Sequence, residues 1–295
     1  MDNLTHGITG VGIAYITQEL IKTPQSGLVA CALISSQLPD LDVILGSRSK
    51  TAYLKYHRGF SHSLLLAPVF AFLTALSVNF FTPQNNFRLL FLVSLLSLGL
   101  HLFFDLLNAY GTKLLWPFSN RRYAWDILMI IDPLIILIFS LGLGLYIWQN
   151  QKGLLFSLYP FLGLYILSMI NFRFKAKRYL LKIFSSYKNV GLLPPLLGWR
   201  KWNFIVQQEE IFYLGQVDAY NGTVDIKEKL CKGKECKFVL ATKDNPEVQV
   251  FLDFARFPWY SINEMDDDII IKWSDLRYRL REREHFTLLA KSKIK

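Results

Sequence analysis

Long apolar runs in the first 170 residues limit this chain to a small set of folds. Four of them approach the roughly 20 residues that an α-helix needs to cross a bilayer. They are Phe60–Phe81, Phe87–Leu107, Ile127–Trp148 and Gly153–Ile170. Lipid offers no hydrogen bonds to an exposed backbone, so such runs must fold as helices. We therefore expect a mainly α-helical bundle in a membrane.

Two shorter apolar runs, Gly7–Leu20 and Gly27–Leu38, precede these four. They could be thin spanning helices or a re-entrant pair. Met1–His6 has neither the basic segment nor the cleavage site of a signal peptide, so we expect none. The prediction is a polytopic bundle of about six apolar helices.

The basic residues predict how this bundle is oriented. If six segments cross alternately, the loops on the N-terminal side carry 13 Lys and Arg residues. The opposite loops carry three, namely Lys22, Arg88 and Lys152. The side richer in basic residues is normally cytoplasmic. We therefore expect a multi-pass protein of the cytoplasmic (inner) membrane with its N-terminus in the cytoplasm.

A change in pattern near residue 190 predicts a second domain. Residues 173–188 are basic and amphipathic, and either lie along the anionic leaflet or continue the sixth helix. The break GLLPPLLGW follows, so we place the boundary between 1–190 and 191–295. The β-rich runs beyond it predict a small all-β cytoplasmic domain. They are EIFYLGQVDAY, KFVLAT, VQVFLDF and DIIIKWSDLRY.

Charge and cysteine content exclude some functions for this second domain. The chain has a net charge of +10, but residues 200–295 hold 17 basic against 16 acidic residues. A nearly neutral domain lacks the basic face that binds nucleic acid, so we expect no nucleic-acid partner. Cys231 and Cys236 in CKGKEC have no second cysteine pair, which favours two free thiols over a structural metal.

Acidic residues are scarce in the apolar part, and their placement is informative. Residues 1–199 contain seven, and six of these lie with four of the five histidines in short clusters near the ends of apolar runs. Ionisable groups at membrane depth are costly and usually pair, bind an ion or line a cavity. His and Asp together are common ligands of divalent metals. The clusters predict a metal centre at one membrane face.

Two of these clusters contain histidines. In HLFFD, the i,i+4 spacing places His101 and Asp105 on one helix face, as two ligands or as a ligand and its orienting carboxylate. HRGFSHS carries His57 and His62, and Ser61 is expected to cap the third helix.

Two further features lie on the same predicted side of the bundle. In PDLD, Asp40 and Asp42 could bridge two metal ions or simply form an Asp-rich turn after a helix. His6 opens the first helix. His6 is a candidate metal ligand only because the first helix begins on the side of the bundle where the other clusters lie.

Other polar residues are candidates for substrate binding and proton transfer. Arg58, beside His57, could hold a phosphate or carboxylate through two hydrogen bonds. Arg121 and Arg122 could hold an acidic substrate from the loop before the fifth helix. Asp126 and Asp132 could act as a general base or orient a ligand.

The ordered set of motifs resembles the YdjM family of membrane-bound metal-dependent hydrolases. The matching segments are MDNLTHG, LPDLD, HRGFSHS, HLFFDLLNAYGT, LLWPFSNRRYAWD and IIDPL, with FARFPW and WSDLRYR near the C-terminus. The resemblance implies a hydrolase in the cytoplasmic membrane. It also implies seven candidate ligands: His6, Asp40, Asp42, His57, His62, His101 and Asp105.

That family is distantly similar to zinc-dependent phospholipase C, which holds several zinc ions with His and Asp on helices. This chain lacks a glutamate in its clusters, which departs from the phospholipase pattern. The expected function is hydrolysis of a phosphoester, which could be a lipid, with zinc, or else manganese, as cofactor. Membrane lipid is the expected partner. The alternative is a metal transporter or sensor with the same ligands. A scaffold without metal would leave the acids unexplained.

Overall fold

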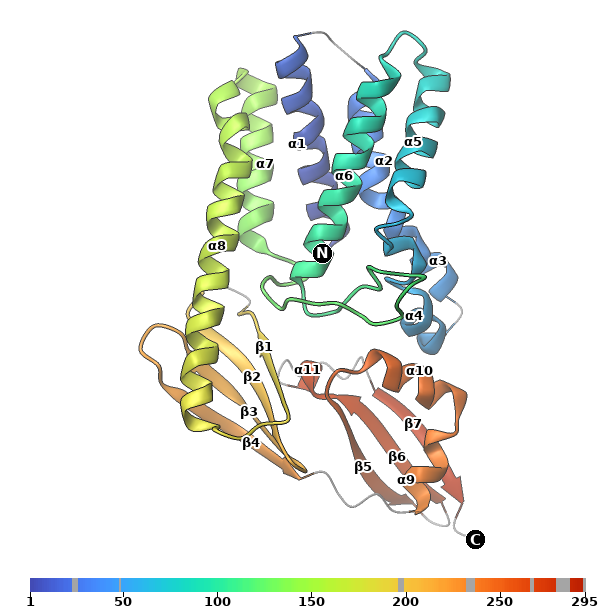
Figure 1. Cartoon of the computed structure of the whole chain (residues 1–295), viewed down its shortest axis with the longest axis vertical. Helices are drawn as coiled ribbons and strands as arrows, with labels where there is room; N and C mark the ends of the chain where they lie inside the picture. The colour runs from blue at the N-terminus through green and yellow to red at the C-terminus, as the bar shows by residue number, and fades with distance from the viewer. Residues whose placement is uncertain are drawn as a thin grey trace. The chain divides into compact units, whose positions relative to one another are not determined.

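The computed structural model describes residues 1–22, 26–47, 49–195, 199–231, 237–265, 268–279 and 287–293 (Figure 1). Its contacts group the chain into two compact units. One comprises Met1–Ser47 and Tyr56–Ile170, and the other comprises Arg48–Lys55 and Asn171–Lys295. Residues 171–190, which the sequence places with the helical part, are grouped by their contacts with the second unit.

Helices make up the first unit. They are α1 (Asn3–Ile21), α2 (Gly27–Gln37), the 3₁₀ helix η1 (Leu38–Asp42), α3 (Val43–Gly46), η2 (Phe60–His62), α5 (Ala67–Phe81), α6 (Phe87–Leu107), α7 (Pro133–Gln149) and the first part of α8 (Lys152–Ile183). The short helix α4 (Lys50–Tyr56) precedes η2 and falls mostly in the second unit. In Figure 1 the long helices α1, α2, α5, α6 and α7 run alongside one another.

Local sequence sets the ends of these helices. The Asp2 side chain accepts hydrogen bonds from Thr5 N and Thr5 Oγ1 and so caps α1. Asp132 caps α7, with Pro133 as its first residue. Pro39 lacks a backbone N–H and cannot continue an α-helix. The chain therefore changes to the 3₁₀ form after α2, which brings Asp40 and Asp42 into η1.

Small residues allow α1 and α2 to pack closely. A Cβ atom on Gly10 would lie 2.9 Å from the Cβ of Ser36 and 3.1 Å from the carbonyl oxygen of Ala32. Ala14, Leu28, Ala32 and Val93 extend this contact as a buried core between α1, α2 and α6. The polar residues near the N-terminal end of α1 are thereby held against the last turn of α2.

The described residues contain three or four candidate membrane spans rather than a demonstrated six. Gly27–Gly46, Phe87–Leu107 and Lys152–Ile183 are long and apolar enough to cross a bilayer. The pair Lys50–His62 and Ala67–Phe81 is bent by 79° and would count as one broken span. The 17-residue helix Pro133–Gln149 is shorter.

Two expectations for individual helices were wrong or incomplete. The expected straight run Phe60–Phe81 is broken, because Ser63 takes an extended conformation and α5 begins only at Ala67. Ser61 therefore lies inside η2, whose capping residue is Gly59, and does not cap the third long helix. The basic segment after Ile170 continues α8 as far as Ile183, which confirms one of its two expected placements.

The second unit contains two antiparallel sheets. The first has the order β1-β2-β3-β4, with β1 (Asn189–Leu193), β2 (Lys201–Gln208), β3 (Ile211–Asp218) and β4 (Val224–Cys231). Phe184, just after α8, packs on this sheet against Phe204 and Tyr213. Asp218 closes the β3–β4 turn. Burial opposes its ionisation, but hydrogen bonds from Tyr220 N and Arg200 outweigh that effect and lower its pKa.

The second sheet shows that the all-β prediction was wrong. It has the order β5-β6-β7, with β5 (Pro258–Met265), β6 (Asp268–Asp275) and β7 (Thr287–Lys293). The expected strands KFVLAT and VQVFLDF are instead helices α9 (Lys237–Lys243) and α10 (Pro246–Phe254), and α11 (Leu276–Arg279) follows β6. Asn245 caps α10 ahead of Pro246. Residues 232–236 of CKGKEC lie outside the described residues.

Candidate metal centre

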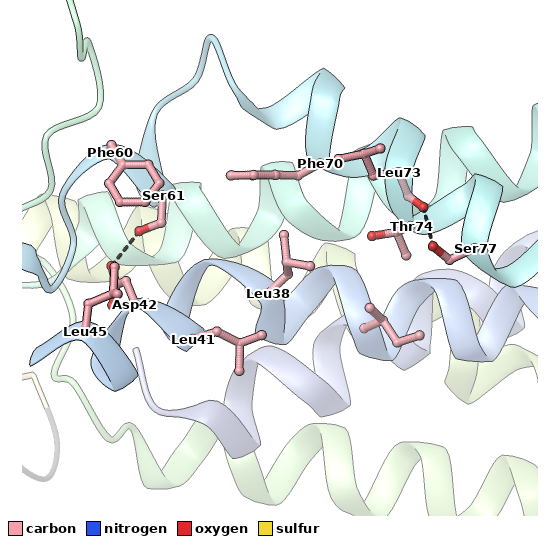
Figure 2. Close-up of a pocket in the computed structure, with 11 residues that line it drawn as sticks. Leu38, Leu41, Asp42, Leu45, Phe60, Ser61, Phe70, Leu73, Thr74 and Ser77 are labelled. Carbon is pink, nitrogen blue, oxygen red and sulfur yellow. Dashed lines mark hydrogen bonds between the residues drawn. The ribbon is translucent and has the colours of Figure 1, made fainter. Parts of the chain in front are cut away.

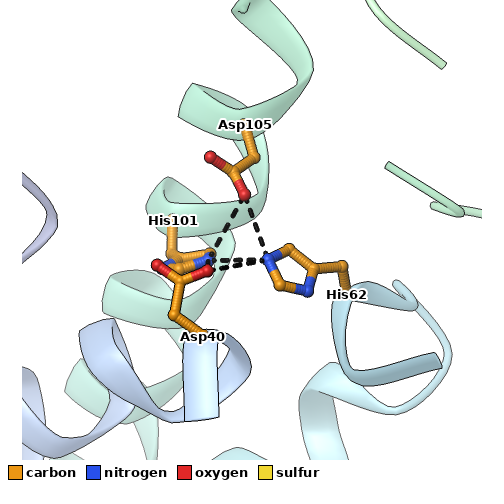
Figure 3. A group of neighbouring side chains, drawn as sticks. All are labelled: Asp40, His62, His101 and Asp105. Atoms are coloured by element: carbon orange, nitrogen blue, oxygen red, sulfur yellow. Dashed lines mark hydrogen bonds and ion pairs between the residues drawn. The ribbon is translucent and has the colours of Figure 1, made fainter. Parts of the chain in front are cut away.

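Four separate segments of the first unit meet at one point. They are the start of α1, the 3₁₀ helix after α2, η2, and the last turns of α6. Each brings one of the sequence clusters, and the last three place Asp40, His62, His101 and Asp105 side by side (Figure 3). One donor atom from each of these residues lies within 4.8 Å of the other three. We call these four residues the quartet.

His62 Nε2 lies at the middle of the quartet. It is 3.0 Å from Asp105 Oδ2, 3.3 Å from Asp40 Oδ1 and 3.2 Å from His101 Nε2. His101 Nε2 lies 3.6 Å from Asp105 Oδ2, as the i,i+4 spacing on α6 predicts. The side chains of His62, His101 and Asp105 are fully buried, and that of Asp40 is 7% exposed. Any access from solvent is therefore on the side of Asp40.

Neighbouring acceptors fix the tautomers of both histidines. His101 Nδ1 is 2.7 Å from the carbonyl oxygen of Ser36, which can only accept a hydrogen bond, so Nδ1 carries the proton. His62 Nδ1 lies 3.0 Å from Ser61 Oγ, which gives its own proton to Asp42 Oδ2 and can accept from Nδ1, and 3.3 Å from that Oδ2. With Nδ1 protonated in each neutral ring, the two Nε2 lone pairs point at each other and at the carboxylates. In metal sites, the partner of a histidine's second ring nitrogen likewise fixes the tautomer and leaves the other nitrogen free to bind the metal.

These four metal-binding atoms fit a cation. Two imidazole lone pairs and two carboxylate oxygens all carry negative or partial negative charge, and atoms of this kind packed so closely repel one another unless a positive charge lies between them. Asp40 Oδ1 and Asp105 Oδ2, which face the quartet, are buried, and the contacts described for them there are with the Nε2 atoms of His62 and His101. Buried polar atoms are otherwise nearly always paired. The quartet could therefore hold a metal ion.

His6 adjoins the quartet from α1. Its ring stacks on that of His101 with centroids 3.8 Å apart, and its Nε2 lies 3.4 Å from Asp105 Oδ1. The amino nitrogen of Met1 contacts the same Asp105 oxygen and lies 2.9 Å from His6 Nε2. His6 thus faces the second oxygen of Asp105, on the side away from His62.

Asp42 links His57, Ser61 and the backbone of Arg58 to the quartet. Its Oδ1 lies 2.8 Å from His57 Nδ1, and its Oδ2 accepts hydrogen bonds from Ser61 Oγ at 2.5 Å and Arg58 N at 2.9 Å. The same Oδ2 faces His62 Nδ1. Asp42 and His57 therefore lie one step outside the quartet, and Asp42 orients one of its histidines.

Arg58 is buried beside the centre. Its Nη2 lies 2.9 Å from Asp105 Oδ1, its Nη1 donates to Asn108 Oδ1 at 2.8 Å, and its guanidinium stacks on Tyr110. Its backbone has a φ of 56°, a region that costs a non-glycine residue about 1–3 kcal/mol. The hydrogen bond from its N–H to Asp42 and the buried guanidinium contacts hold it there.

Comparison with known proteins identifies the family of this chain. Residues 1–175, more than half of the chain, match the YdjM inner membrane protein family. The chain belongs to that family. Residues 237–294 match the YfhP C-terminal alpha/beta plait domain.

The uncharacterized protein YfhP of Bacillus subtilis (strain 168) is 28% identical over 98% of this chain and 90% of its own length. No solved structure matches. Membership of YdjM, together with the apolar helices, makes this a membrane protein, and it confirms the resemblance seen in the sequence motifs. The alpha/beta match agrees with the helices α9 and α10 found where strands were expected.

Four other residues that the sequence singled out in this YdjM member are not part of the quartet. Arg122 Nη1 donates to the carbonyl oxygens of His57 and Gly111, and Arg121 lies over the Tyr123 ring. Asp132 accepts from Leu134 N, Ile135 N and Tyr165 Oη, as a helix cap does. Asp126 is buried, with a φ of 54°. Of these, Arg122 touches the surroundings of the centre.

The sequence did not indicate the supporting roles of three residues at the centre. Asn108 donates to Asp105 Oδ1 and accepts from Arg58, and Ser61 binds Asp42. The Ser36 carbonyl orients His101. Asn108 follows Asp105 by three residues as the C-cap of α6, so its closeness in sequence to Asp105 could have found it. No sequence signal points to a backbone carbonyl.

Proposed function

We propose that this protein is a metal-dependent hydrolase of the cytoplasmic membrane that cleaves a phosphoester, including lipid phosphoesters. The observation that carries the proposal is the quartet, in which two imidazole nitrogens and two carboxylate oxygens face one another in a buried site. Membership of the YdjM inner membrane protein family supports the membrane location. The excess of basic residues on the loops of the N-terminal side supports the cytoplasmic face.

Ligand chemistry and charge favour one divalent ion. Mixed imidazole and carboxylate ligands suit zinc, with manganese as the alternative. Asp40, Asp42 and Asp105 bring three negative charges and Arg58 one positive charge. The Met1 amino group also contacts Asp105, so one divalent cation brings these groups close to neutrality, whereas a second would leave a large positive excess at a site where unbalanced charge is costly.

The residues around the quartet divide the chemistry among them. A divalent ion held there would supply Lewis acidity and a water of lowered pKa. Asp42 holds His57 through Nδ1, so the remaining ring nitrogen of His57 can take a proton from a nucleophile, and we assign His57 as general base. Arg58 and Asn108 hold Asp105 in place. In these assignments neither residue is a metal ligand: Arg58 contacts the ligand Asp105, and His57 contacts Asp42, which orients the ligand His62.

Metal analysis and phosphoester turnover on the same preparations test the proposal. Purified protein in detergent should contain divalent metal and hydrolyse one or more compounds in a phosphoester screen. His101→Ala and Asp105→Asn should each lose most of the metal and the turnover. Glu19→Gln is a matched control, because Glu19 also lies on a first-unit helix but pairs with Lys152 and Tyr146. The control should keep both properties.

Two results would count against this function. Full metal content in folded His101→Ala and Asp105→Asn variants would remove the quartet as the site. Bound metal without turnover on any phosphoester would favour the metal transporter. One observation supports that second candidate. The buried hydroxyls of Ser35 and Ser97 have no hydrogen-bond partner among the described residues, and Ser97 lies one turn from His101 on α6. Metal uptake into proteoliposomes would identify a transporter.

A further inference from the structure

An apolar pocket of about 450 Å³ opens beside the metal centre (Figure 2). One wall comes from α2, η1 and α3, with Leu38, Leu41 and Leu45, and the other from α5, with Phe70 and Leu73. Its volume falls within the range of small-molecule sites. The lining is predominantly aliphatic and aromatic, so the ligand that fits it is a hydrocarbon.

Both walls belong to candidate membrane segments. The first lies in Gly27–Gly46 and the second in the bent pair that ends at Phe81. Leu41 and Leu73 line the pocket and are each more than half exposed on the protein surface. In a spanning segment such a face meets lipid tails rather than water. The pocket is therefore accessible from the bilayer.

One end of the pocket is polar and adjoins the centre. Asp42 and Ser61 line that end, and Asp42 also holds His57 and faces His62 of the quartet. At the other end Ser77 lies about two turns beyond Phe70 on α5. The hydroxyl of Ser77 donates to the carbonyl oxygen of Leu73, which satisfies it within the helix. Hydrocarbon bound along the pocket would therefore have its polar end beside Asp42.

We propose that this pocket binds one acyl chain of a membrane phospholipid and so places the phosphoester headgroup at the metal centre. The inference rests on the proposed hydrolase and specifies its substrate as a lipid. The volume suits one chain, and the second chain of a phospholipid would stay in the bilayer. The pocket also measures the chain, because its length from Asp42 to Ser77 sets how many methylenes are bound.

Two tryptophan variants on α5 separate this pocket from its surroundings. Leu73→Trp fills the pocket, whereas Leu76→Trp is a matched control, because Leu76 is 49% exposed against 51% for Leu73 and does not line the pocket. The substrates are a soluble nitrophenyl phosphate and a phosphatidic acid series of increasing chain length. Leu73→Trp should raise KM for the long chains about tenfold or more, since each methylene that loses its contact weakens binding about fourfold. Nitrophenyl phosphate turnover and metal content should be unchanged.

A second variant tests the chain-length prediction. Ser77→Trp blocks only the end far from Asp42, so it should move the preferred substrate to shorter chains without loss of turnover. Native mass spectrometry supplies a readout that does not depend on catalysis. One phospholipid should remain bound to the parent protein and to Leu76→Trp, and none to Leu73→Trp.

The outcomes keep the two proposals apart. Equal lipid retention and equal chain preference in the parent and both pocket variants would overturn the pocket while leaving the hydrolase intact. Lipid lost only in Leu73→Trp, with no turnover of any phosphoester in the parent, would support the pocket and overturn the hydrolase. Preference for nitrophenyl phosphate over every lipid would overturn the lipid substrate.

Discussion

At the residue scale, the centre depends on side chains that lie outside the quartet. Asp42 contacts four groups, including both His57 and His62, although it is not among the four closest ligands. Outer carboxylates of this kind fix the ring orientation of a ligand and raise its basicity. The difference between a ligand and its orienter is thus set here by which nitrogen of His62 the carboxylate faces, Nε2 for Asp40 and Asp105 and Nδ1 for Asp42.

The first prediction concerns Asp42. Asp42→Asn should weaken metal binding about 10–100-fold, because an amide cannot accept hydrogen bonds from all four partners. Competition with a chromophoric chelator measures the change. Ser61→Ala removes only one hydrogen bond to Asp42 and should have a much smaller effect. An unchanged affinity in Asp42→Asn would show that Asp42 does not support the centre.

The second prediction concerns Arg58, which the sequence assigns to phosphate binding. Its guanidinium instead pairs with buried Asp105, and removing one partner of a buried pair costs about 3–5 kcal/mol. Arg58→Ala should therefore lower the thermal midpoint in detergent and reduce metal content. Arg58→Lys should recover part of the midpoint, since a single ammonium cannot bind Asp105 and Asn108 as the guanidinium does. An intact midpoint and metal content with lost turnover would restore the phosphate role.

At the scale of elements, the close contact of α1 with α2 positions His6 and the Ser36 carbonyl at the same place. Gly10 makes this approach possible, because any side chain there would meet Ser36 and the Ala32 backbone. The cap at Asp2 fixes where α1 begins, one turn before His6. Helix packing and helix capping therefore act together on the geometry of the centre.

The third prediction tests this contact. Gly10→Ala should destabilise the protein by about 1–3 kcal/mol, as overpacking of a close contact does, and should reduce metal affinity by displacing α1. Gly99→Ala on α6 is the control, because nothing lies within 4 Å of a Cβ built there. Thermal midpoints and metal content measure both variants. Equal behaviour of the two would mean that α1 tolerates a shift without cost.

At the scale of the whole molecule, the question is how the chain passes through the membrane. The ends of α1, α2 and α6 that carry the quartet and its neighbours meet at one end of the first unit, as alternating crossings would require. Three helices pass the length and hydropathy criteria among the described residues, and a bent pair could add a fourth. The topology measurement described next determines whether α1 and α7 span the bilayer.

The fourth prediction is the topology. A reporter fused after Lys188 should lie in the cytoplasm, and one fused after Lys22 should lie on the opposite side, from the distribution of basic residues. If both report the cytoplasm, α1 and α2 form a re-entrant pair. If the fusion after Lys188 reports the outside, the metal centre faces away from the cytoplasm and the proposed site of action changes.

Local periodicity in the sequence was enough to predict the apolar helices, the pairing of His101 with Asp105 and the clustering of acids at one end of the bundle. Helical spacing is a short-range property, and residue clusters placed at alternate helix ends lie on one side of the bundle. The same reasoning placed strands at residues 237–242 and 248–254, where the structure has α9 and α10. Short apolar runs fit either period, so tertiary packing decides between them.

Only the tertiary structure decided which residues form the quartet and which surround it. His57 and His62 lie five residues apart, yet only His62 reaches His101 and Asp105, because the positive-φ turn at Arg58 and the helix η2 lie between them and leave the two rings at 83° to each other. The inward contact of Arg58 likewise depends on Asp105 and Asn108, far along the chain. Such contacts follow from backbone turns and from chain segments brought together over long separations, and neither is encoded in the spacing of residues.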